Sequence, residues 1–110
     1  MQTQKTARIR ALNDDLRAHG KGGLVVVTRG LLEFGLPFAA KVRAAIARET
    51  DVAAENDPYG EHDFGAVDIE GNRIFWKIDY YDIERRYGSE DPSDPAITQR
   101  VMTIMLADEY

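Results

Sequence analysis

The residues best suited to catalysis gather in two polar segments, residues 56–65 and 77–82. Histidine is the side chain that titrates near neutral pH and also ligates metals, and one histidine, His62, lies in the first segment. The carboxylates around it could act as a general base or as oxygen ligands of a divalent ion. One hypothesis is therefore a small metal-assisted hydrolase. Its candidate catalytic residues are His62 and Asp79, and its candidate metal ligands are His62, Glu61 and Asp82.

The same two segments also fit a surface that binds a partner without catalysis. Their spacing matches no named zinc or calcium motif, and a histidine among acidic residues is common on protein surfaces. The aromatic side chains Phe64, Phe75 and Tyr81 would add a patch of the kind found at protein interfaces. The expected binding surface consists of Asp57, Glu61, His62, Asp63, Phe64, Lys77, Asp79, Tyr81 and Asp82.

A third hypothesis gives these residues a structural role only. His62 would then hydrogen-bond a backbone carbonyl, and Asp57 would cap the turn that Pro58 begins. Lys77 and Asp79 would form surface charge pairs with Asp68 or with each other, and each such pair contributes only tenths of a kcal/mol to about 1 kcal/mol. The three hypotheses differ in whether the two segments meet, and this depends on the strands that carry them.

A β-hairpin is the best-defined local element of the sequence. The dipeptide Gly71-Asn72 is a two-residue turn signal between predicted strands 63–69 and 73–81. This turn places Ile69 opposite Ile74, Val67 opposite Trp76, Gly65 opposite Ile78, His62 opposite Tyr81 and Glu61 opposite Asp82. One face is apolar, with Val67, Ile69, Ile74, Trp76, Ile78 and Tyr80. The other is more polar and carries His62, Phe64, Asp68, Phe75, Lys77, Asp79 and Tyr81.

The remaining elements complete a single α+β domain over residues 1–110, in the order α-β-α-β-β-α. A first helix is expected from Thr3 or Thr6 to about His19, and a second from Pro37 to about Glu49. The apolar run 24–28 predicts a central strand. Asp94 and Pro95 predict the start of a last helix, and residues 29–35 fit either a helical turn or a packed loop. We expect a small antiparallel sheet with helices packed on one face.

Charge is divided sharply along the chain. The net charge of −5 combines a balance of +6 over residues 1–48 with a balance of −11 over residues 49–110. Eight acidic residues and no basic one lie between Arg48 and Arg73. The two halves either neutralise each other inside the fold or leave an acidic surface that attracts a basic partner and repels nucleic acid. Direct binding to nucleic acid needs a basic stripe and is not expected.

Composition sets further limits. The chain of 110 residues has no cysteine, which excludes disulfides and thiolate metal sites and fits a reducing compartment. No apolar run approaches the roughly 20 residues that a membrane span needs, and the charged N-terminal segment differs from a signal peptide. The segment 20–23 lacks the spacing of a phosphate-binding loop. We expect a cytoplasmic protein with no cofactor and no membrane contact.

Several stretches resemble one known family. They are residues 8–14, residues 56–65, Phe75-Trp76-Lys77-Ile78-Asp79-Tyr80-Tyr81-Asp82, Asp91-Pro92-Ser93-Asp94-Pro95 and Thr103-Ile104-Met105-Leu106-Ala107. Together they resemble domain of unknown function 3768 over nearly the whole chain. Its members are similar small proteins of alphaproteobacteria, often encoded near plasmid, conjugative-element or phage genes. The resemblance implies an accessory role, such as regulating transfer or blocking host defences by binding, and it implies no catalytic residue.

The leading functional hypothesis is a non-enzymatic binding protein whose acidic half presents a recognition surface. The charge division, the lack of a catalytic signature and the setting implied by the resemblance all favour it. The expected partner is a protein that is basic or binds nucleic acid, as part of a nucleic-acid-handling or host-defence complex. The metal-assisted hydrolase is the alternative. A subunit of a larger assembly, including a homo-oligomer, is the third hypothesis.

Overall fold

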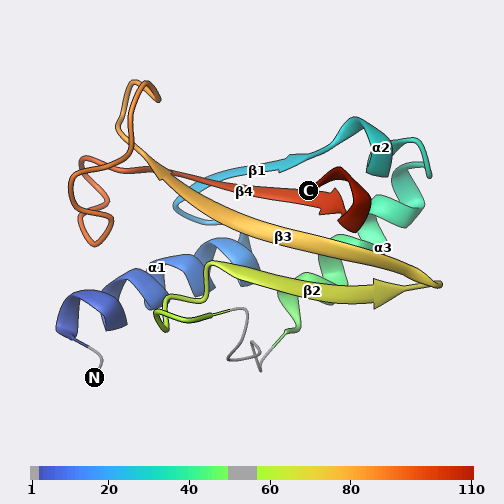
Figure 1. Cartoon of the computed structure of the whole chain (residues 1–110), viewed down its shortest axis with the longest axis horizontal. Helices are drawn as coiled ribbons and strands as arrows, with labels where there is room; N and C mark the ends of the chain where they lie inside the picture. Colours follow the sequence, from blue (N-terminus) through green and yellow to red (C-terminus); the bar gives the residue numbers. More distant parts are fainter. Residues whose placement is uncertain (1–2, 50–56) are drawn as a thin grey trace.

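A four-stranded sheet with helices against one face organises the chain (Figure 1). The computed structural model describes residues 3–49 and 57–110. The strands lie in the order β1-β4-β3-β2, with β1 parallel to β4 and the other neighbours antiparallel. This confirms the α+β class, although the sheet is mixed and not purely antiparallel. The elements are α1 (Gln4–His19), β1 (Gly23–Val27), α2 (Arg29–Leu32), α3 (Leu36–Ala47), β2 (Phe64–Ile69), β3 (Asn72–Tyr81), β4 (Gln99–Leu106) and the 3-10 helix η2 (Ala107–Glu109).

The N-terminal helices follow their sequence signals. The side chain of Thr3 accepts a hydrogen bond from the backbone N of Thr6 at 3.0 Å and so caps α1, and Gly20 ends it with a φ of 68°. Pro37 lies in the first turn of α3, where its missing N–H leaves no bond unmade. Residues 29–35, for which the sequence fits either a helical turn or a packed loop, begin with the short helix α2. The two long predicted helices are therefore confirmed.

The expected last helix is a strand. Residues 99–106 form β4, which lies at the middle of the sheet and pairs with both β1 and β3. Arg100, Met102 and Ile104 are buried at every second position, which is the strand period. Ile97, Val101 and Ile104 also recur at a helical spacing, so the apolar pattern of this segment fits both structures. Pairing of this segment with both β1 and β3 stabilises the strand over the helix.

The apolar run predicted as the central strand lies at the edge of the sheet. β1 pairs only with β4 among the described strands, and Leu24 and Val26 are 44% and 46% exposed. Its other side chains, Val25 and Val27, pack against the core. The continuous β-branched sequence therefore reflects strand propensity and not burial on both faces.

The predicted hairpin exists, but its turn lies one residue earlier. Ile69 pairs with Asn72 and Val67 with Ile74, so Glu70 and Gly71 form the turn with φ angles of 51° and 82°. Gly65 consequently lies opposite Trp76, where a Cβ at position 65 would come within 2.5 Å of the indole ring. The predicted pairs of Ile69 with Ile74 and of Val67 with Trp76 are wrong by two positions. A shift of two keeps every side chain on its predicted face.

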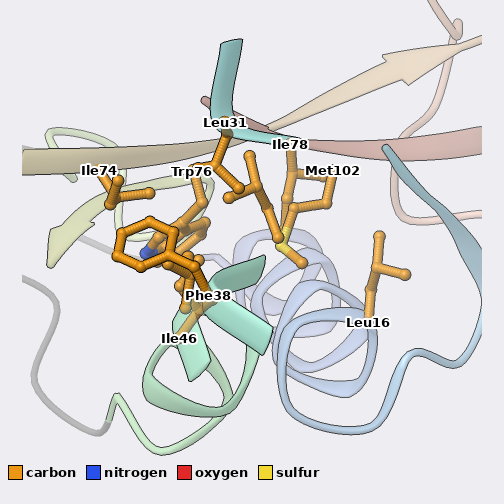
Figure 2. Close-up of a cluster of buried hydrophobic side chains, with 10 residues drawn as sticks. Leu16, Leu31, Phe38, Ile46, Ile74, Trp76, Ile78 and Met102 are labelled. Atoms are coloured by element: carbon orange, nitrogen blue, oxygen red, sulfur yellow. The ribbon is translucent and has the colours of Figure 1, made fainter. Parts of the chain in front are cut away.

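The core lies between the inner face of the sheet and the helices (Figure 2). In Figure 2, the side chains from the sheet point toward those of α1 and α3, and Trp76 is fully buried. This confirms that the helices cover one face. The buried cluster consists of Leu16, Leu31, Phe38, Val42, Ile46, Ile74, Trp76, Ile78, Met102 and Ile104. The opposite, outer face carries Phe64, Phe75, Lys77 and Asp79, which places part of the predicted surface there.

Candidate recognition surface

A depression lies where the segment 57–63 leads into β2. It has a volume of about 320 Å³, and four residues of the predicted surface line it: Asp63, Phe64, Lys77 and Asp79. Tyr59 and Tyr110, which are 75% and 71% exposed, line it as well, with Pro58 and Ile78. The backbone N of Ile78 donates to the carbonyl of Asp63 at 2.8 Å and fixes the start of β2 against β3. We call these eight lining residues the acidic–aromatic depression.

Three aromatic rings stiffen one side of the depression. Phe64 and Phe75 lie side by side on neighbouring strands with ring centroids 5.2 Å apart. Tyr110 packs edge-on against both rings, at 5.6 Å from Phe64 and 5.7 Å from Phe75. Such arrangements are favourable because the positive edge of one ring meets the negative face of another. Of the predicted aromatic patch of Phe64, Phe75 and Tyr81, the first two therefore lie together. The third ring of the cluster is Tyr110, and Tyr81 pairs with Gln99 at the other end of β3.

Negative charge accumulates at the depression. Burial raises the pKa of Asp63, and the nearby carboxylates of Glu61, Asp57 and Asp79 raise the pKa further. Lys77 lies beside Asp79, with its Nζ 3.3 Å from a carboxylate oxygen, which is one of the two pairings that the structural hypothesis allowed, while Asp68 pairs with Arg73. None of the ion pairs within residues 3–49 and 57–110 includes Asp63. Asp63 is therefore the carboxylate of this surface best placed to receive an external cation.

The segment 57–63 is tied to α1 through His62 (Figure 1). The Nδ1 of His62 lies 2.8 Å from Asp14, and its Nε2 lies 3.7 Å from Asp57. The backbone N of His62 also donates to Asp57 at 2.9 Å, while His62 itself has a φ of 55°. The positive φ turns the imidazole toward α1 and away from the outer face. His62 thus positions the segment that carries Tyr59 and Asp63.

A buried polar network also holds the segment 57–63 in place. Asn13, which is fully buried, donates to the carbonyl of Glu61 at 3.0 Å and to the hydroxyl of Tyr80 at 2.8 Å. Tyr80 in turn donates to the carboxylate of Glu61 at 2.8 Å, and burial raises the pKa of the Tyr80 hydroxyl. Arg100 donates to Asn13 at 2.8 Å and to the carbonyl of Pro92, and burial lowers the pKa of Arg100. The network joins α1, β3, β4 and the segment before β2.

Asp57, Glu61 and His62 therefore do not lie in the outer surface as expected. The imidazole of His62 contacts Asp14, and the carboxylate of Glu61 accepts a hydrogen bond from Tyr80. The carboxylate of Asp57 accepts one from the backbone N of His62. The predicted pairing of His62 with Tyr81 and of Glu61 with Asp82 is wrong, because β2 begins at Phe64 and pairs there with Lys77. His62 has a φ of 55° and lies outside the ladder, so those pairs do not form.

Tyr81 and Asp82 belong to the other end of β3. Tyr81 pairs with Gln99 of β4 and bridges to Gly88. The carboxylate of Asp82 accepts a hydrogen bond from the backbone N of Arg86 at 3.0 Å and so organises the loop that follows β3. Of the proposed metal ligands, His62 and Glu61 lie beside α1 and Asp82 lies in this loop. In the described part of the chain, no three His, Asp or Glu side chains are arranged to hold a metal ion.

Three residues that hold the segment 57–63 and the helices in place were not predicted from the sequence: Asn13, Arg17 and Arg100. Arg17 donates to the carbonyls of Ile46 at 3.0 Å and Glu49 at 2.7 Å, and so ties the end of α3 to α1. A signal was present in the helical phase, since Asn13 and Arg17 follow Ile9 by four and eight residues and share its buried face. Arg100 gives no such signal, because it lies in the segment after Pro95 that is predicted as a helix.

None of the helices among the described residues is long and apolar enough to cross a membrane.

Comparisons with known proteins give one match. No curated protein and no solved structure matches the chain. One family model covers residues 27–109 and so includes β1, the hairpin and β4, whereas the resemblance at residues 8–14 lies outside the match. The chain therefore belongs to the family described as protein of unknown function (DUF3768).

Proposed function

We propose that this chain is a non-enzymatic binding protein that recognises a positively charged protein through the acidic–aromatic depression. The observation that carries the proposal is the lining itself. Asp63 and Asp79 stand beside the exposed rings of Tyr59 and Tyr110, in a hollow on the outer face of the sheet. Exposed aromatic residues and complementary charge are the features that give protein interfaces their affinity and their association rate.

The way in which the segment 57–63 is held supports a recognition role. Its anchors, His62 and Glu61, bind inward to α1 and Tyr80, so Tyr59 and Asp63 are presented on a fixed support. A preorganised surface loses less conformational entropy when a partner binds. Burial and the neighbouring carboxylates raise the pKa of Asp63, so the fold disfavours its charged form, and a cationic partner would relieve this cost.

The charge of the partner suggests its class. Proteins that handle nucleic acid carry lysine- and arginine-rich surfaces that neutralise phosphates. An acidic surface can occupy such a site and exclude the nucleic acid by direct competition. We therefore place the partner in a cytoplasmic nucleic-acid-handling or host-defence complex. The mobile-element setting that the family resemblance implies agrees with an accessory protein that inhibits such a complex.

A capture experiment with matched charge changes tests the proposal. The tagged protein and the double variant Asp63→Lys/Asp79→Lys would be used to capture proteins from lysate of the native host, with identification by mass spectrometry. The control, Asp68→Lys/Glu84→Lys, makes the same change in net charge at exposed residues outside the depression. We expect a basic protein to be captured by the wild type and the control, and lost with the Asp63/Asp79 variant. Equal capture by all three would overturn the proposal.

A further inference from the structure

We propose that the acidic–aromatic depression receives an arginine side chain of the partner protein. This inference rests on the proposed function and narrows it to one chemical group. The depression combines three kinds of lining that suit a guanidinium: the exposed aromatic rings of Tyr59 and Tyr110, the ring of Phe64, and the carboxylates of Asp63 and Asp79. Its volume of about 320 Å³ is at the lower end of ordinary ligand pockets, which suits one side chain.

The aromatic rings favour an organic cation over a neutral apolar group. The face of an aromatic ring attracts a cation because its electron density is negative, and arginine is the cation found there most often. The edge-on packing of Tyr110 against Phe64 and Phe75 holds one ring of the depression in place. Tyr59 also lines the depression, on the segment anchored by His62. A planar guanidinium can therefore stack on an aromatic ring of this lining.

The carboxylates favour arginine over lysine. Asp63 takes part in none of the ion pairs among the described residues, whereas Asp79 already contacts Lys77 at 3.3 Å. The guanidinium carries five donors in a fixed planar fork and is weakly hydrated, so it can bond two separate acceptors while it stacks. A compact ammonium lacks this geometry. The guanidinium would bond Asp63 directly and share Asp79 with Lys77.

The positive charge of Lys77 distinguishes a cationic ligand from an anionic one. Its ammonium lies in the lining and repels an incoming cation, while it would attract an anion. Replacing Lys77 by methionine keeps much of the side-chain bulk and removes the charge. If the depression takes an arginine, Lys77→Met must strengthen binding. If the depression takes an anionic group through Lys77, the same substitution must weaken binding.

The experiment titrates the purified full chain with tetra-arginine, tetra-lysine and tetra-glutamate peptides, followed by two-dimensional amide NMR. We expect tetra-arginine to shift the amide signals of residues 59, 63, 64 and 77 and to bind several-fold more tightly than tetra-lysine. Asp63→Asn should weaken the binding of tetra-arginine about twofold to fivefold, as loss of a water-screened charge interaction does. Tyr59→Ala should weaken it about twofold to fivefold. Lys77→Met should tighten it about twofold to fivefold.

The control variant is Asp68→Asn. Asp68 lies on the same outer face of β2, paired with Arg73 at 3.1 Å and outside the depression, so tetra-arginine affinity should not change. Equal binding of tetra-arginine and tetra-lysine, with no shift at Tyr59 or Phe64, would overturn the arginine site while leaving a general acidic surface intact. Tighter binding of tetra-glutamate, weakened by Lys77→Met, would overturn both the arginine site and the proposed function.

Discussion

The substitution Asp63→Asn should stabilise the protein, because a recognition residue is expected to be poorly satisfied in the free state. Burial and the carboxylates of Glu61, Asp57 and Asp79 raise the pKa of Asp63 from its ordinary value of 3.8. A raised pKa means that the folded state disfavours the charged form. Asparagine keeps the shape and one acceptor oxygen while it removes the charge. Stability and binding should therefore change in opposite directions in this variant.

The size of the effect follows from the partial exposure of the site. A single charge interaction in a half-exposed position is screened by water and contributes up to about 1 kcal/mol. We therefore expect Asp63→Asn to raise the free energy of unfolding at pH 7 by about 0.5–1 kcal/mol. For a domain of this size, that corresponds to a rise in Tm of roughly 2–6 °C.

The pH dependence has a definite sign. The folded-state pKa of Asp63 lies above the unfolded value, so its contribution to stability is fully present below the unfolded pKa and is lost as the pH rises through the folded pKa. The advantage of Asp63→Asn should therefore be near zero close to pH 4 and should grow toward pH 7. Thermal unfolding between these pH values, followed by the fluorescence of the buried Trp76, measures the difference.

Asp91 provides a control of opposite sign. Hydrogen bonds from Ser93, at 2.6 Å from its hydroxyl and 3.1 Å from its backbone N, lower the pKa of Asp91. Its stabilising contribution is present above the unfolded pKa and is lost as the pH falls through the folded pKa, so Asp91→Asn should destabilise at pH 7. A neutral or destabilising effect of Asp63→Asn at pH 7, or an effect independent of pH, would refute the reasoning.

Three further predictions test the fold and the alternative function. Gly65→Ala should lower the free energy of unfolding in urea by about 1–3 kcal/mol, because the new methyl would overlap Trp76, and no change would contradict the hairpin register. Arg100→Met should destabilise by about 2–4 kcal/mol, since Asn13 and the carbonyl of Pro92 would lose a buried charged donor. Thermal unfolding of this variant within about 0.5 kcal/mol of the wild type would contradict the network. Calorimetric titration with zinc, manganese and magnesium should show no binding, whereas binding that His62→Ala abolishes would favour the metal-assisted hydrolase.

The sequence predicted the faces of the hairpin but not its register. The preference of asparagine for positive φ favoured Gly71-Asn72 as the turn, yet Glu70 takes that conformation and Asn72 begins β3. The contact between Gly65 and Trp76 offers a physical reason for the observed register. Any residue with a side chain opposite Trp76 would collide with the indole, and position 65 is a glycine. Such a contact depends on the three-dimensional packing of a ring that no local pattern specifies.

The sequence also predicted only part of the recognition surface. Phe64, Lys77 and Asp79 follow from strand alternation, and all three line the depression. Asp63 lines it as well, although alternation alone would place residue 63 on the inner face with Gly65. His62 has a positive φ although it is not a glycine, and its side chain contacts Asp14 on a helix 48 residues away in sequence. The strand β4 was missed because its apolar residues fit two periods, and only pairing with β1 and β3 distinguishes them.

Site-specific photo-crosslinking in host cells tests the recognition surface most directly. A photoreactive phenylalanine would replace Tyr59 in the depression or Tyr87 in the loop after β3, which are 75% and 74% exposed and so equally accessible. We predict a covalent adduct with a basic protein from position 59, lost when Asp63 is changed to lysine, and none from position 87. An adduct from position 87 alone, or one from position 59 that survives Asp63→Lys, would contradict the account.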